Sequence, residues 1–212
     1  MTKSKKQKEL DEELLRECEG YHARQDKPDG AYIEEGEYFF NINKIKRLIE
    51  AGAKVNAKDK RGNSPLHWAV GRNNVALVKL LISAGADVNS KTKYGRSPLF
   101  NVSYVSIAKL LISAGADVNA KNNDGESPLH FVRYVPVVKL LISAGANVNV
   151  KGGYTRESPL HRAVDMHNVA LVKLLIKAGA DVNAKNSSDK TPLYYARTKI
   201  IQALLIEHGA TK

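Results

Sequence analysis

Apolar residues recur along this chain at helical spacing. Residues 75–82 read Val-Ala-Leu-Val-Lys-Leu-Leu-Ile, and Lys79 is the only charged side chain among them. A helix with so wide an apolar surface packs against neighbours on more than one side, while its lysine faces water. Earlier in the chain, Ser64 supplies an N-cap oxygen and Pro65 suits a first helical turn, so a helix is predicted to begin at Pro65. The two segments predict a pair of antiparallel helices.

Glycine marks the end of this pair. Gly85 follows the second apolar segment, where a glycine fits the left-handed conformation that satisfies the last helical carbonyls. The polar stretch that begins Asp-Val-Asn at residue 87 leads toward the next Ser-Pro pair, and we expect it to form an extended, hairpin-like finger. One structural unit is therefore a helix, a turn, a second helix and a finger.

This unit is repeated along the chain. The Ser-Pro-Leu phrase at residue 64 returns at residues 97, 127 and 158, and as Thr-Pro-Leu at residue 191, at intervals of 33, 30, 31 and 33 residues. The terminating glycines recur as Gly52, Gly85, Gly115, Gly145, Gly179 and Gly209. A unit this short cannot bury its own apolar face, so neighbouring units must stack into a solenoid. The doubled leucines, such as residues 110–111, are the predicted cohesive columns.

The repeated phrases resemble the ankyrin repeat family, whose pattern includes Thr-Pro-Leu-His-x-Ala and Gly-Ala-Asp-Val-Asn at a period of 33. The resemblance covers roughly residues 31–212. It implies an all-α ankyrin-repeat solenoid of about six repeats. We expect a degenerate capping repeat at residues 31–63, four repeats at residues 64–190 and a shortened C-terminal capping repeat at residues 191–212.

Several units depart from the pattern. Relative to residues 70–75, the segments 103–105 and 133–135 lack three residues at the turn between the helices, and residues 197–198 lack the same three. We expect the inner helix to be shorter or its turn tighter there, which would lower the concave side in the middle; random variation in a tolerant turn is the alternative. The finger at residues 152–157 gains one residue and should protrude or bulge.

Residues 1–30 have a different composition from the repeats. Among their Glu and Lys residues, the apolar side chains at near-helical spacing are Leu10, Leu14, Cys18 and Tyr21. This spacing predicts an amphipathic helix around residues 8–24, followed by a turn-rich linker. We expect the helix to dock on the exposed edge of the first repeat as a lid. The alternative is a mobile arm that grips a partner.

Composition limits the class of protein. With 212 residues, 43% of them apolar, and one cysteine, the chain can bury a core but cannot form a disulfide framework. No uninterrupted apolar run is long enough to span a membrane, so we expect no integral membrane segment. We also expect a soluble, cytoplasmic protein that is a monomer. The net charge is +11, and the excess lies in the repeats, because residues 1–30 hold seven basic and eight acidic side chains.

Catalysis needs unlike polar groups at one place, whereas the polar residues here recur in columns, one per unit. His67, His130 and His161 occupy the same repeat position, and the resemblance implies that they bond to the neighbouring cap and loop rather than to a metal. The chain has no Gly-x-Gly-x-x-Gly, Walker-type or Cys-x-x-Cys motif. We therefore expect no enzyme activity, no metal and no cofactor.

Lysines form two rows. The first row follows the Asn of each finger and the second lies in each second helix; in that order they are Lys58, Lys91, Lys121, Lys151 and Lys185, then Lys46, Lys79, Lys109, Lys139 and Lys173. Their simplest role is to solubilise two faces. A weak, salt-sensitive attraction to nucleic acid or anionic surfaces is also expected.

Better candidates for binding are residues that vary between units. The resemblance implies that contacts come from finger tips, from the position after the cap phrase and from the inner-helix end. These candidates are Trp68, Arg72, Tyr94, Arg96, Asn101, Tyr104, Phe131, Arg133, Tyr134, Tyr154, Arg156, Arg162 and Met166. Aromatic residues and Arg dominate, and these types are enriched at interface hot spots.

The sequence thus predicts a protein–protein interaction module that binds a partner, expected to be acidic, on its concave face and finger tips. Two alternatives stay open. One is binding of nucleic acid or an anionic membrane through the lysine rows. The other is a bacterial or viral effector that uses its repeats on a host protein, in the host cytosol.

Overall fold

The computed structural model describes residues 3–22, 38–39 and 41–211. It begins with one long helix, α1 (Lys3–Glu19). An outer row of nine-residue helices consists of α2 (Ile42–Glu50), α4 (Val75–Ser83), α5 (Val105–Ser113), α6 (Val135–Ser143), α8 (Val169–Lys177) and α10 (Lys199–Glu207). An inner row of shorter helices precedes the last five: α3 (Pro65–Gly71), η1 (Pro98–Asn101), η2 (Pro128–His130), α7 (Pro159–Asp165) and α9 (Pro192–Tyr195).

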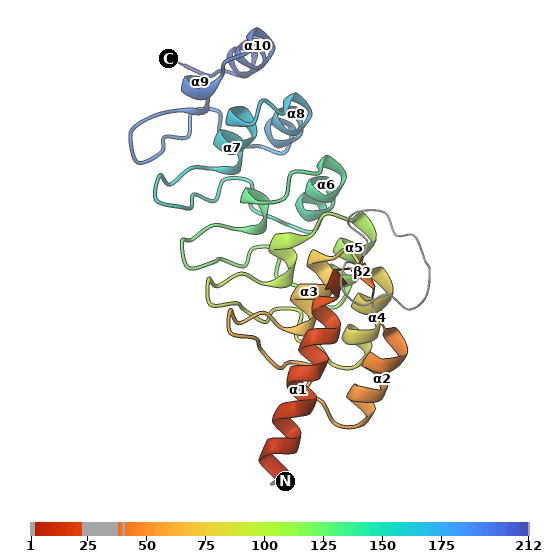
Figure 1. Ribbon diagram of the computed structural model, residues 1–212. Coiled ribbons are helices and arrows are strands. Elements are labelled where there is room, and N and C mark those ends of the chain that lie inside the picture. The colour runs from red at the N-terminus through yellow and green to blue at the C-terminus, as the bar shows by residue number, and fades with distance from the viewer. Residues whose placement is uncertain (1–2, 23–37, 40, 212) are drawn as a thin grey trace.

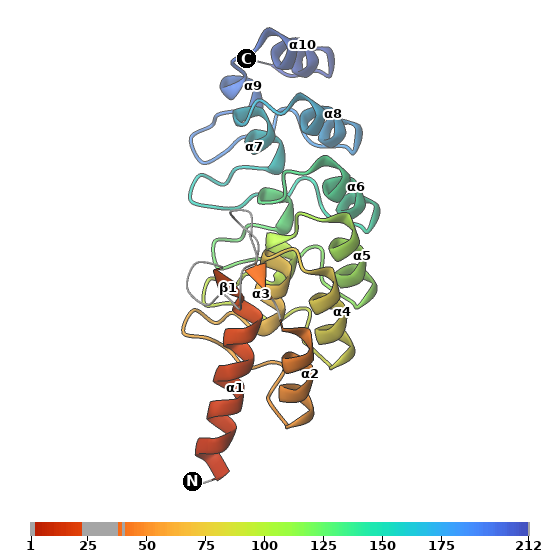
Figure 2. The same ribbon diagram turned by 45° about the vertical axis from the view of Figure 1, so that its right-hand side comes forward.

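These helices form an elongated stack. The chain runs from α1 at one end to α9 and α10 at the other, and extended fingers project from one side (Figure 1). The outer helices follow one another along the opposite edge (Figure 2). Apart from the two-residue strands β1 (Tyr21–His22) and β2 (Tyr38–Phe39), which pair antiparallel, the regular structure of the described residues is helical. This confirms the predicted all-α stack of helix pairs.

Local sequence signals set the helix boundaries as predicted. The helix α3 begins at Pro65, directly after the extended residue Ser64. Gly85, which follows α4, has a φ of +84°, the left-handed conformation expected there. The fingers are hairpin-like, since the peptide N–H of Thr92 donates to the carbonyl of Arg96 at 3.0 Å across one of them.

The three-residue deletions change the inner row. The helices α3 and α7 each have seven residues, whereas η1 and α9 have four and η2 has three, and η1 and η2 are 3₁₀ turns. A 3₁₀ turn rises more per residue than an α-helix, so a shorter segment can still connect the cap to the outer helix. The prediction of a shortened inner helix is confirmed.

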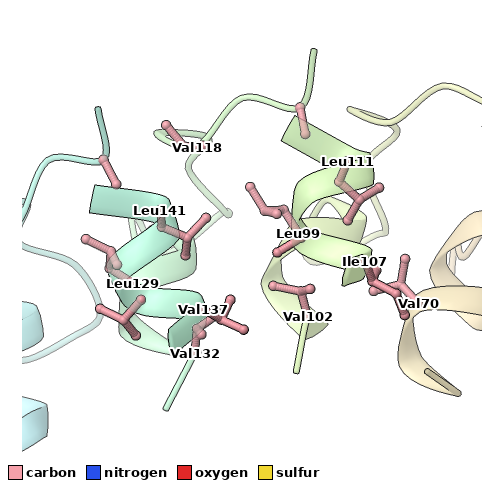
Figure 3. Close-up of a cluster of buried hydrophobic side chains, with 14 of the residues drawn as sticks. Val70, Leu99, Val102, Ile107, Leu111, Val118, Leu129, Val132, Val137 and Leu141 are labelled. Carbon is pink, nitrogen blue, oxygen red and sulfur yellow. The ribbon is translucent and has the colours of Figure 1, made fainter. Parts of the chain in front are cut away.

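Apolar columns run through the stack between the two rows. The second leucine of each pair is at the centre: Leu111 and Leu141 are fully buried and lie near Leu99 and Leu129 of the inner row (Figure 3). The first leucine, such as Leu110, is only half-buried. The doubled leucines are therefore unequal, and the second of each pair supplies most of the cohesion, about 1.5–3 kcal/mol for a buried leucine.

An asparagine ladder joins the fingers of neighbouring units. The Asn119 amide donates to the carbonyl of Gly145 at 2.9 Å, and its Oδ1 accepts the peptide N–H of Asn147 at 2.8 Å. The same pair of bonds to the next unit is made by Asn56, Asn89, Asn149 and Asn183. Each asparagine thus holds the backbone that follows the outer helix of the next unit.

The N-terminal helix completes the first helix pair. It packs against α2 and α3, and its side chains Leu14 and Cys18 are fully buried. Desolvation raises the pKa of the Cys18 thiol to about 12, and the charge of the neighbouring Glu17 adds to this shift. The structure therefore shows the predicted docking on the first repeat rather than a free arm. The predicted bounds of 8–24 were wrong, because the helix covers Lys3–Glu19 and Tyr21 lies in β1.

The same helix closes the asparagine ladder. Gln7 Nε2 donates to the carbonyl of Gly52 at 3.0 Å, and the peptide N–H of Lys54 donates to Asp11 Oδ1 at 2.7 Å. These backbone groups correspond to the ones that an asparagine holds in every later unit. Gln7 and Asp11 together therefore replace the asparagine of a preceding repeat.

Electrostatic contacts fix the other end of α1. Lys44, near the start of α2, lies 2.8 Å from both Glu13 and Glu17. Hydrogen bonds to Glu13 and Glu17 raise the pKa of Lys44. The predicted repeat boundary at residue 31 falls outside the described residues and stays a prediction.

No helix in the described part of the chain is both long enough and apolar enough to cross a membrane.

We predict that Leu111→Ala lowers the free energy of unfolding by about 2–5 kcal/mol, because it opens a cavity in the middle of the stack. Denaturant unfolding followed by far-ultraviolet circular dichroism measures this change. The matched variant Leu110→Ala, at a half-buried position, should lose clearly less. Equal losses would contradict the assignment of the central column.

We predict that Asn119→Ala lowers the free energy of unfolding by about 1–3 kcal/mol, since two hydrogen bonds of about 0.5–1.5 kcal/mol each are lost. The same denaturant titration applies. Ser113→Ala, at an exposed position of α5, is the control and should unfold like the unmodified protein. A stability of Asn119→Ala that matches this control would show that the ladder contributes nothing.

Candidate protein-binding surface

The histidine column is structural. The peptide N–H of Ser127 donates to Nδ1 of His130 at 3.0 Å, so the ring proton is on Nε2, which donates to the carbonyl of Glu157 at 3.1 Å. His67 and His161 make the equivalent bonds to the carbonyls of the next unit. The predicted bonding to cap and loop is confirmed. Burial is the main cause that lowers the pKa of all three imidazoles.

Phe100 breaks this column. It occupies the histidine position of its unit, is almost fully buried, and leaves the buried hydroxyl of Ser97 without a hydrogen-bond partner in the described structure. Its ring lies 5.6 Å from the ring of Phe131. The exchange of a histidine for a phenylalanine was visible in the sequence, but Phe100 was not among the predicted site residues.

Two arginines lie against Phe131. The guanidinium carbon of Arg96 is 4.3 Å from the centre of the Phe131 ring, and that of Arg162 is 6.0 Å from it. Arg162 also donates to Glu126 Oε1 at 2.6 Å. Three predicted site residues from three different units therefore form one cluster, held by cation–π contacts and an ion pair.

A hollow of about 640 Å³ opens beside this cluster, where the inner helices are short. It is lined by Gly71, Phe100, Asn101, Val102, Ser103, Phe131, Val132, Arg133 and Tyr134. The predicted residues Asn101, Arg133 and Tyr134 thus share one cavity. The hollow coincides with the short inner helices, while the lowering of the concave side relative to its flanks stays a prediction.

A second hollow of about 680 Å³ adjoins the first. It is lined by Ser103, Tyr104, Val105, Ser106 and Tyr134. Tyr104 and Tyr134 precede α5 and α6, are 52% and 55% exposed, and do not cap these helices with their side chains. At the corresponding position before α4, Asn74 does cap its helix, by accepting the peptide N–H of Leu77.

The finger tips carry a separate group of predicted residues. Tyr94 is 64% exposed and Tyr154 is 98% exposed, while Arg156 is an exposed residue with a φ of +49°. Backbone hydrogen bonds join neighbouring fingers, for example from the peptide N–H of Gly153 to the carbonyl of Asp124 at 2.9 Å. The protrusion or bulge of the longer finger stays a prediction.

Three predicted residues lie apart from the central cluster. Arg72 Nε donates to the carbonyl of Glu19 at the end of α1, and its guanidinium carbon is 5.6 Å from the Trp68 ring. Both side chains are half-buried beside α1 rather than open on the middle units. Met166 is the half-buried residue that follows α7.

The first lysine row has structural contacts. Lys58 Nζ donates to the carbonyl of Lys91 at 2.8 Å, and Lys151 Nζ donates to the carbonyl of Lys185 at the same distance. The second row lies on the outer helices, and the lysines of both rows are exposed. Among the residues that the structure describes, no group of three or more His, Cys, Asp or Glu side chains could hold a metal ion.

Comparison with known proteins agrees with this geometry. A family model described as ankyrin repeats matches three overlapping segments, residues 37–122, 100–186 and 132–212. The matches cover most of the chain, and the protein therefore belongs to the ankyrin repeat family. A search of curated proteins finds no match.

We predict that acidification destabilises this protein through its buried histidines. Their pKa values are lower in the folded state than the unfolded value of about 6.5, so the stabilisation is complete above about pH 6.5 and is lost as the pH falls toward the folded pKa. His130→Phe, which copies the residue found at Phe100, should reduce the loss of unfolding free energy between about pH 7 and about pH 5. Denaturant titrations at the two pH values measure it, and identical losses in both proteins would refute the role of His130.

Proposed function

We propose that this ankyrin-repeat protein is a non-catalytic module that holds a partner protein on the concave face and finger tips of its middle repeats. Ankyrin repeats are generally protein–protein interaction modules. The observation that carries the proposal is the cluster of Arg96, Phe131 and Arg162 beside an open hollow. Aromatic and arginine side chains around a pocket are the usual anchors of an interface.

The exposed tyrosines support this location. Tyr94, Tyr104, Tyr134 and Tyr154 are more than half exposed and lie on fingers or turns of the middle units. Tyrosine brings a large apolar surface with few rotatable bonds, so binding orders it at low entropic cost. A preformed rigid stack lowers the cost of association further, because little backbone has to be ordered.

The charge of the chain favours an acidic partner. The net charge is +11 and the repeats carry more than all of it. Long-range attraction of this kind speeds encounter with a negatively charged protein and loses strength as salt is added.

We further infer that the solenoid has about six repeats, with a capping repeat at residues 31–63 against which α1 packs and residues 191–212 as the shortened last one. At the far end, Gln202 stands where α8 has the buried Val172, and its side chain donates to the carbonyl of Ala196 at 2.7 Å. A half-buried polar residue at a position that is apolar and buried in the earlier outer helices suits a capping repeat, whose outer face is polar.

Attachment to nucleic acid or to an anionic membrane is the second candidate function. It rests on the two lysine rows, whose side chains are exposed. Tight binding with a steep dependence on salt, measured by filter binding at two ionic strengths, would favour this function over protein binding. An effector that acts on a host protein would use the same concave surface as the first candidate.

We predict that joint replacement of Tyr104, Arg133 and Tyr134 by Ala abolishes capture of the partner, with the thermal midpoint nearly unchanged because all three side chains are exposed. Loss of one such anchor costs on the order of 1–2 kcal/mol or more. Affinity capture from a lysate with both proteins, followed by mass spectrometry, measures the loss. If the triple variant still captures the partner, the binding site does not depend on these three residues and lies elsewhere on the protein.

A further inference from the structure

Two hollows of the middle units adjoin one another. They share the lining residues Ser103 and Tyr134, and together their linings reach from Phe100 and Phe131 to Val105 and Ser106 at the start of α5. We call this space the ridge trough, defined by the residues that line the two hollows. It extends from the inner turn η1 to the start of the outer helix α5.

The shape of the ridge trough suits an extended chain. Each hollow has a volume in the range of small-ligand pockets. Phe100, Val102 and Val132 line the first hollow but are nearly fully buried, so half-buried Phe131 is the more accessible apolar side chain there. Two adjoining hollows of this size can accept neighbouring side chains of one extended segment.

The charges along this route are positive. Among the described residues that line the trough, Arg133 is the one charged side chain, and it is exposed. Beyond the trough, Lys109 lies one helical turn after Ser106 on α5, and α5 and α6 contain no acidic residue. Arg96 adds a third positive charge against the Phe131 ring.

From this we infer that the ridge trough binds an extended acidic peptide segment of a partner protein, with an apolar side chain of the segment against Phe131 and carboxylates against Arg133 and Lys109. This assignment rests on the proposed protein-binding function and specifies its ligand. A second copy of the chain is a poor occupant, because it would bring a charge of +11 to a positive surface.

A fluorescein-labelled probe peptide of the sequence Asp-Glu-Asp-Phe-Glu-Asp tests the inference by fluorescence polarisation. We expect saturable binding by the full chain. A charge-reversed probe, with Lys in place of each acidic residue, should not bind. Arg133→Glu should weaken binding at least tenfold, as expected for loss of an interface anchor together with charge repulsion, and Lys109→Glu should weaken it less.

Matched control variants separate the loss of a contact in the ridge trough from a general reduction of the positive charge of the protein. Arg197 occupies the position of Arg133 in the last unit, which has the same short turn but Thr198 in place of a tyrosine, and Lys79 is the α4 equivalent of Lys109. Arg197→Glu and Lys79→Glu should each change the affinity less than twofold. Equal effects of Arg133→Glu and Arg197→Glu would overturn the site.

A second variant tests shape without removing positive charge. Residues 103–104 are replaced by the full-length turn Val-Gly-Arg-Asn-Asn, which this chain uses at residues 70–74. The longer turn should fill the trough and abolish probe binding, while the circular dichroism spectrum and thermal midpoint stay close to those of the unmodified protein. Binding that survives this replacement overturns the inference, as does displacement of the probe by an equal concentration of oligothymidylate.

One comparison distinguishes the failure of this inference from the failure of the proposed function. If the finger variant Tyr94→Ala/Tyr154→Ala loses the partner captured from a lysate but the filled-trough variant keeps it, the partner binds on the fingers and only the ridge trough is refuted. If the unmodified protein captures no partner and binds no probe, both proposals fail.

Discussion

Contact between neighbouring units is the interaction on which the rest of this structure depends. A single unit of two short helices and a finger exposes too much apolar surface to be stable, and burial becomes sufficient only when the next unit covers it. The buried leucines of the outer helices supply most of this cohesion, and the asparagine ladder aligns each unit with the next. Together they make a rigid, extended surface from elements that would not fold separately.

The position of these contacts explains how the central hollow can exist. The leucine column and the asparagine ladder lie in the outer helices and in the fingers, away from the turn that joins the two helices of a unit. Three residues can therefore be lost from that turn without removing either interaction. The deletions convert α-helical turns into the 3₁₀ turns η1 and η2 and leave space above Phe100 and Phe131. The shape of the surface thus varies independently of the cohesion of the stack.

The N-terminal end shows how a terminal unit satisfies the same requirement. Every later unit has its ladder groups held by an asparagine of the unit before it. The first has no such neighbour, and α1 supplies Gln7 and Asp11 instead, while Leu14 covers the apolar face. A helix with no repeat motif in its sequence therefore performs the task of a repeat, because the interactions required are the same.

The sequence by itself determined the features that depend on local chain geometry: the helix start at Pro65, the left-handed Gly85 and the shortened inner helices. Each follows from capping, backbone conformation or residue count within one unit. Only the tertiary structure decided which varying residues meet. Phe131 lies between arginines from two other units, Trp68 and Arg72 lie beside α1, and Phe100 belongs to the site. These contacts join residues about thirty positions apart or more, and they are set by how the units pack, which periodicity does not encode.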